Sequence, residues 1–194
     1  MTIKINKKQI IVGLDCDTEE EVETILTLLD PNLYRVKVGK QLFMNCGPNI
    51  IEKINNFGFE IFLDLKLHDI PNTVSKALQN ILKLNIWMTN IHLSGGREMI
   101  EASVNKIKEF NNETLLVGVT VLTSLDDKNI EEIGFYRNTE ESTLVLAKLG
   151  KEIGIDGVVA SLNSVSEIKT TFGNDFVTVT PGIRMQQSDE DQKR

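Results

Sequence analysis

Four charged residues are placed where two apolar runs of the chain could bring them together. Asp64 and Lys66 are two residues apart within one run, Asp69 follows just past its end, and Lys37 lies in the run before it. Residues two apart in an extended strand share a face, so the Asp64 and Lys66 side chains should point the same way. We expect the four to form a cluster of alternating charge, in which opposite charges keep one another ionised.

A lysine flanked by carboxylates is an ammonium group that is held rigidly, with three hydrogen-bond donors and a proton to give. Such a group can deliver a proton to a carbanion. The alternative is a structural salt bridge that ties two strands together, since ion-pair networks also occur for structural reasons. Spacing alone leaves both interpretations open.

Seven short apolar runs, each followed by a longer amphipathic stretch, must position these residues. Strands are predicted at 9–14, 34–38, 60–65, 86–93, 114–122, 157–160 and 176–180. Helices are predicted at 17–29, 48–57, 72–84, 98–110, 140–153 and 164–171, and 123–139 is expected to be a long loop. Alternation without hairpins predicts an α/β fold with a parallel sheet covered by helices.

The spacing of about 25 residues per unit is typical of a (β/α)8 TIM barrel, in which residues at the carboxyl ends of strands face the active site. The alternative is an open doubly wound sheet, which normally carries a Gly-rich phosphate turn after its first strand. Here that turn contains Leu14, Asp15, Cys16 and Asp17, so the glycines are missing. We therefore favour the barrel, with seven of its eight units visible.

Composition limits the class of protein. The 194 residues carry a formal charge of -7, with 41% hydrophobic and 25% charged residues, which is ordinary for one globular domain spanning 1–194. The acidic balance argues against nucleic-acid binding. No apolar run approaches the roughly 18 residues of a membrane span, and the N-terminus has no signal-peptide pattern. Cys16 and Cys46 are expected to be reduced thiols, and the protein is expected in the cytoplasm.

One decapeptide, Asp-Leu-Lys-Leu-His-Asp-Ile-Pro-Asn-Thr at 64–73, resembles the signature of the orotidine 5'-phosphate decarboxylase family. Further segments resemble the family in the same order and at the same spacing: 14–15, 37–40, 92–96, 119–124, 156–159 and 180–184. Any one tripeptide would be weak support, but the ordered set covers nearly the whole chain.

The resemblance implies a (β/α)8 barrel that works as a homodimer, with two active sites at the subunit interface. It implies a lyase of de novo pyrimidine synthesis. The reaction would convert orotidine 5'-monophosphate to uridine 5'-monophosphate and CO2, with neither a metal nor an organic cofactor.

The resemblance also implies residue roles. Lys66 would protonate C6 of the pyrimidine, and Asp64 would lie against the departing carboxylate and help to hold Lys66. Asp69 would join the partner's site, with Thr73, and complete an array with Lys37. The substrate-binding residues would be Asp15, Lys37 and Thr73 at the ribose, Thr123 near the pyrimidine, and Arg184 and Gln192 at the phosphate.

A rival enzyme class has a similar fold. Mg²⁺-dependent sugar-phosphate decarboxylases and hexulose-phosphate synthases resemble this family and share an Asp-x-Lys-x-x-Asp core, but they use acidic metal ligands on neighbouring strands. Here Lys37 stands in place of a carboxylate, and Ile70, Pro71, Asn72 and Thr73 follow the core. Both features favour the nucleotide enzyme and predict no metal site.

Proteins of the family have an eighth strand, and a Gly-Arg pair on it binds the phosphate of the substrate. The 194 residues contain no such strand after 176–180. We therefore expect a C-terminally incomplete barrel, either because the gene product is longer or because the chain is a truncated, inactive barrel with open sheet edges.

Overall fold

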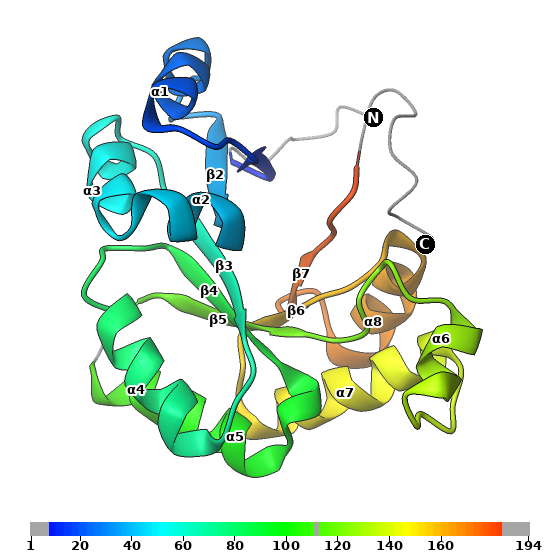
Figure 1. Ribbon diagram of the computed structural model, residues 1–194. Helices are drawn as coiled ribbons and strands as arrows, with labels where there is room; N and C mark the ends of the chain where they lie inside the picture. The colour runs from blue at the N-terminus through cyan, green and yellow to red at the C-terminus, as the bar shows by residue number, and fades with distance from the viewer. Residues whose placement is uncertain (1–7, 111–112, 184–194) are drawn as a thin grey trace.

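Seven parallel strands follow one another in sequence order through a single curled sheet (Figure 1). The computed structural model describes residues 8–110 and 113–183. The strands are β1 (Ile10–Leu14), β2 (Tyr34–Gly39), β3 (Ile61–Leu67), β4 (Met88–His92), β5 (Leu115–Val119), β6 (Gly157–Val159) and β7 (Val177–Val179). Each strand pairs in parallel with the next, which confirms the predicted alternation.

Helices follow the strands as expected, with two additions. They are α1 (Glu19–Leu28), α2 (Lys40–Cys46), α3 (Asn49–Asn56), α4 (Pro71–Ile81), α5 (Arg97–Glu109), α6 (Asp127–Glu132), α7 (Thr139–Ile153) and α8 (Val165–Phe172), with short 3₁₀ turns η1 (Leu93–Gly95) and η2 (Leu162–Ser164). The prediction that 123–139 is all loop is wrong, since it contains α6, and α2 was also missed. Both helices have seven residues or fewer, too short for helical periodicity to stand out.

The two faces of the sheet bury different sets of side chains. One face packs against the helices, through Leu14, Val36, Val38, Leu63, Ile91, Leu116 and Val158 among others. The inner face carries a smaller apolar layer built on Phe62, Met88 and Val117, with Ile11, Val159, Val177 and Val179 packed around it. This division follows from the period of two along each strand.

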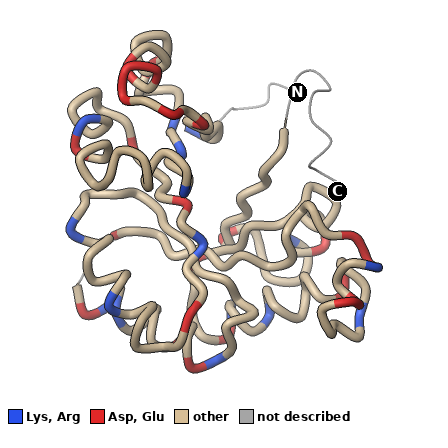
Figure 2. Tube along the Cα trace, in the orientation of Figure 1, with Lys and Arg blue, Asp and Glu red and all other residues tan. Residues whose placement is uncertain are grey.

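The charged residues of interest lie on this inner face, beyond the apolar layer. Asp64 is two residues past Phe62 on β3, and Asn90 is two residues past Met88 on β4, so each shares the face of its predecessor. Charged positions elsewhere lie mostly on helices and loops, as around α1 (Figure 2). The inner face therefore changes from apolar to polar toward the carboxyl ends of the strands.

The pairing of β3 with β4 is irregular at this level. Leu63 pairs with Thr89, but the next pair is Leu67 with Ile91. Between these two pairs β3 therefore advances by four residues while β4 advances by two. Within the extra length Lys66 has a φ of 50°, in the left-handed region. The irregularity acts as a β-bulge, which re-aims side chains next to it.

The described sheet ends at β1 on one side and at β7 on the other, dark blue and red in Figure 1. This agrees with the seven units expected from the sequence. None of the helices within 8–110 and 113–183 is long and apolar enough to cross a membrane.

Candidate active site

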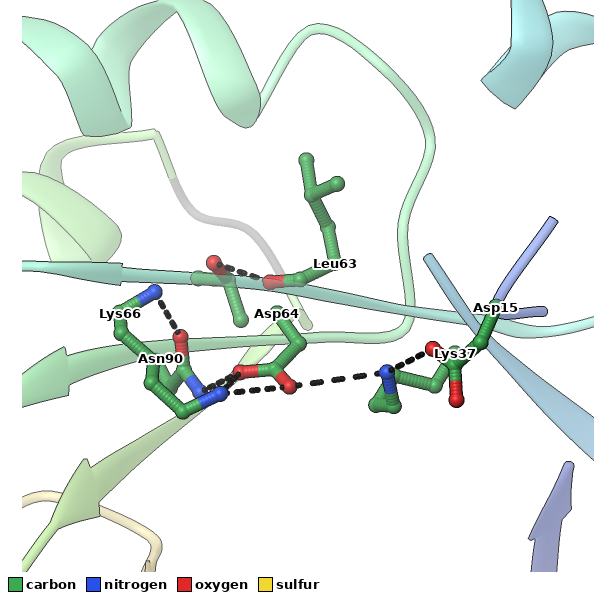
Figure 3. A network of polar contacts seen from close by, with 7 residues as sticks. Asp15, Lys37, Leu63, Asp64, Lys66 and Asn90 are labelled. Atoms are coloured by element: carbon green, nitrogen blue, oxygen red, sulfur yellow. Dashed lines mark hydrogen bonds and ion pairs between the residues drawn. The ribbon is translucent and has the colours of Figure 1, made fainter. Parts of the chain in front are cut away.

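The carboxylate of Asp64 is the most buried acidic group of the site, with a residue exposure of 8%. Lys66 lies beside it, with its Nζ 2.7 Å from Oδ1 and 2.8 Å from Oδ2 (Figure 3). One ammonium therefore contacts both carboxylate oxygens. A buried carboxylate is tolerated when it is paired and hydrogen-bonded in this way.

A second ammonium extends the pair into a chain of alternating charge. Nζ of Lys37, on β2, lies 3.9 Å from Oδ2 of Asp64 and 3.3 Å from Oδ1 of Asp15 (Figure 3). A Cβ added at Gly39 would lie only 3.3 Å from this Nζ, so the glycine leaves it room. The order along the site is Asp15, Lys37, Asp64, Lys66. The predicted alternation of charge is seen in Lys37, Asp64 and Lys66, but Asp15 takes the fourth place that was predicted for Asp69.

Asn90 joins the site although it was not among the residues predicted from the sequence. Its Nδ2 donates to Oδ1 of Asp64 at 2.6 Å, and its Oδ1 accepts the backbone N–H of Lys66 at 2.7 Å (Figure 3). The signal available in the sequence was a polar pair, Thr89 and Asn90, inside an otherwise apolar run. Thr89 points to the other face, where its hydroxyl donates to the carbonyl of Leu63 at 3.1 Å.

Asp69 does not join this cluster within one chain. It is exposed beyond the end of β3, where its Oδ1 accepts the N–H of Ile70 at 2.6 Å. Among the described residues it makes no ion pair, because the chain has already turned toward Pro71. The structure therefore brings together three of the four residues expected in the cluster.

Two of the other predicted residues lie on a helix and a loop rather than on a strand. Thr73 is exposed in the first turn of α4, and Thr123 is half-buried in the loop that follows β5. Arg184 and Gln192 lie outside the described residues. Across the described ranges, no group of three or more His, Cys, Asp or Glu side chains is placed to hold a metal ion.

Two histidines flank the charged cluster. The rings of His68, just after β3, and His92, at the end of β4, are stacked with their centroids 5.1 Å apart. Burial lowers the pKa of His92 to about 4, and nearby His68, Lys40 and Lys66 act in the same direction. His92 is therefore a neutral imidazole at physiological pH, and it adds no charge to the cluster.

The arrangement can hold an ammonium against a partly buried carboxylate at the carboxyl ends of parallel strands. In barrels of this kind the active site lies at that end. A model of the orotidine 5'-phosphate decarboxylase / HUMPS family matches residues 8–194. The chain belongs to this family.

Individual family members agree. A protein named orotidine 5'-phosphate decarboxylase from Marinomonas sp. (strain MWYL1) is 49% identical over 187 residues, which are 95% of this chain and 80% of that protein. One of the same name from Saccharophagus degradans is 43% identical, over 94% of this chain and 76% of its own length. The solved orotidine 5'-phosphate decarboxylase of Lactobacillus acidophilus superposes with a TM-score of 0.85 and 40% identity, covering 92% and 82% of the two chains. The resemblance and the barrel class predicted from the sequence are thus confirmed.

The lowered pKa of His92 predicts a pH-dependent stability. Between about pH 6.5 and pH 4 the unfolded chain binds a proton at His92 that the folded chain does not, so the free energy of unfolding falls as the pH falls. Because the ring is only half-buried, we expect His92 to account for a loss of about 1 kcal/mol between pH 7 and pH 5.

Urea unfolding of the protein and of His92→Gln at both pH values measures this effect. His92→Gln should lose about 1 kcal/mol less than the parent between pH 7 and pH 5. An equal loss in free energy of unfolding in the two proteins would show that His92 is not its source.

Proposed function

We propose that this protein decarboxylates orotidine 5'-monophosphate to uridine 5'-monophosphate and CO2 in pyrimidine synthesis, with Lys66 as the proton donor. The observation that carries the proposal is the contact of Nζ of Lys66 with both oxygens of Asp64, in a chain of the orotidine 5'-phosphate decarboxylase / HUMPS family. Relatives with this activity in their names support the choice of reaction.

The proposed chemistry follows from the charges of the pair. The bond between C6 and the carboxylate breaks, CO2 leaves, and the electron pair stays on C6 as a vinyl carbanion without a good resonance sink. The ammonium of Lys66 stabilises this charge by being in place beforehand, and then transfers a proton to C6. Lys66 is left as a neutral amine, which solvent reprotonates.

Asp64 has two parts in this mechanism. Its contacts hold the ammonium of Lys66 in one position. In the complex its negative charge lies against the carboxylate of the substrate, which favours departure of that group as neutral CO2. The proton donor and the group that disfavours the bound carboxylate are thus neighbours on one strand.

The rest of the substrate would be bound by groups around the pair. We propose that Asp15, Lys37 and Thr73 contact the ribose hydroxyls, and that Thr123 lies near the pyrimidine. Arg184 and Gln192, outside the described residues, are proposed to face the phosphate. These remote contacts supply the binding energy that positions the ring for reaction.

A homodimer with shared sites is part of the proposal. Asp69 and Thr73 are both exposed, directly after β3 and at the start of α4. They are therefore available to complete the site of a partner subunit. We also propose that the protein works in the cytoplasm, because the charged nucleotides that it would use and release do not cross membranes unaided.

The rival Mg²⁺-dependent sugar-phosphate chemistry is disfavoured by the neighbours of Asp64. Both oxygens of Asp64 contact the ammonium of Lys66, and Lys37 adds a second cation on β2. Two ammonium groups compete with a divalent cation for the same carboxylate, and they repel the cation. Loss of wild-type turnover in EDTA, with recovery on adding Mg²⁺, would instead support the rival.

Lys66→Ala removes the proposed proton donor. We expect kcat for orotidine 5'-monophosphate to fall at least about a thousandfold, since a preorganised charge at the reacting centre is lost. Binding of uridine 5'-monophosphate, measured by calorimetry, should largely remain, because the ribose and phosphate contacts are intact. The control is Lys148→Ala, an exposed lysine on α7, which should leave kcat unchanged. Retained turnover in Lys66→Ala would remove Lys66 from its role.

Shared sites predict complementation between two inactive chains. In a mixed dimer of Lys66→Ala and Asp69→Ala, one site carries both substitutions and the other carries neither. Random mixing in equal amounts makes half of the dimers mixed, so about a quarter of all sites should be intact. We expect mixing after dissociation and reassociation to restore about a quarter of wild-type activity. If mixing restored no activity, the active sites would not be shared between subunits.

A further inference from the structure

Asn90 is wholly buried, with an exposure of 0%, and both ends of its side-chain amide are used. The partners fix which end is which, because the backbone N–H of Lys66 can only donate and the ionised carboxylate of Asp64 can only accept. One side chain on β4 thus holds two neighbouring groups of β3.

The backbone that Asn90 holds is in an unusual conformation. Lys66 has a φ of 50°, a region that costs a residue with a side chain about 1–2 kcal/mol. The N–H of Lys66 falls where β3 and β4 lose their regular pairing, between Leu63 and Leu67. The Oδ1 of Asn90 takes the place of the ladder carbonyl that this N–H would otherwise meet.

The carboxylate that Asn90 holds is the one that contacts the ammonium. Oδ1 of Asp64 accepts from both Nδ2 of Asn90, at 2.6 Å, and Nζ of Lys66, at 2.7 Å. These two contacts limit rotation of the carboxylate. The position of Nζ is therefore set at the ammonium by Asp64 and at the backbone by the hydrogen bond from the Lys66 N–H to Asn90. Asn90 fixes the backbone of Lys66 directly, and it fixes the ammonium through Asp64.

We propose that Asn90 is the positioning residue for the proton donor: its side-chain amide fixes the left-handed backbone of Lys66 and the orientation of Asp64 together. The inference rests on the proposed function. Asn90 need not touch the substrate. Its effect is on the place of Nζ relative to C6, where a shift of about 1 Å can cost about a hundredfold in rate.

The test is a comparison of Asn90→Ala with Thr89→Val. Asn90→Ala removes two hydrogen bonds between β4 and β3, to Lys66 and Asp64. Thr89→Val removes one, from the Thr89 hydroxyl to the carbonyl of Leu63 on the other face. We expect Asn90→Ala to lower kcat for orotidine 5'-monophosphate by about a hundredfold with little change in KM. Thr89→Val should lose stability and keep kcat within about twofold, since a lost structural bond alone does not move the ammonium.

Asn90→Asp serves as a near-isosteric second variant. It keeps an acceptor for the N–H of Lys66 but replaces the donor to Asp64 by a second negative charge. Its kcat should therefore also fall by at least about a hundredfold. Wild-type kcat in either folded variant would overturn the proposal.

Hydrogen exchange provides a readout that does not depend on activity or on a variant. In the wild type the backbone N–H of Lys66 should be protected although it lies outside the ladder, and in a folded Asn90→Ala that protection should be lost at Lys66 alone. Exchange of this N–H at the unprotected rate in the wild type would refute the positioning role. Absence of decarboxylation by the wild type, with the N–H still protected, would instead refute the proposed function and leave the contact standing.

Discussion

Burial of the Asp64 carboxylate determines which groups must surround it in the site. A carboxylate that is 8% exposed loses much of its hydration, and this loss must be offset by charged or hydrogen-bonding partners. Lys66, Lys37 and Asn90 supply those partners from three neighbouring strands. Parallel pairing of β2, β3 and β4 brings them together, so the sheet and the site depend on each other.

The apolar layer beneath the cluster makes its charges more effective. Phe62 and Met88 fill the inner face directly below Asp64 and Asn90, so the cluster has water on one side and hydrocarbon on the other. Charges interact more strongly in such surroundings than in bulk water. A substrate that covers the open side would complete the exclusion of water and strengthen the field at its reacting carbon.

Much of the fold could be predicted from the sequence, and so could the meeting of Lys37, Asp64 and Lys66, because both depend on local periodicity. Alternation of apolar runs and helices gave the seven parallel units, and the two-residue spacing of Asp64 and Lys66 put them on one face. Asn90 stands out only as a polar residue in an apolar run, and its role could not be predicted because it depends on a register change between β3 and β4 that the sequence does not reveal. Asp69 shares the motif with Lys66, yet a turn of the chain separates their side chains.

A crystal structure with uridine 5'-monophosphate bound would show whether the ammonium of Lys66 is held where C6 reacts. We predict the pyrimidine over the inner face at the carboxyl ends of β2, β3 and β4, with Nζ of Lys66 about 3–3.5 Å from C6. We also predict that the contacts of Asp64 with Lys66 and Asn90 are unchanged. A nucleotide bound with C6 turned away from Lys66, or bound elsewhere on the barrel, would exclude Lys66 as the proton donor.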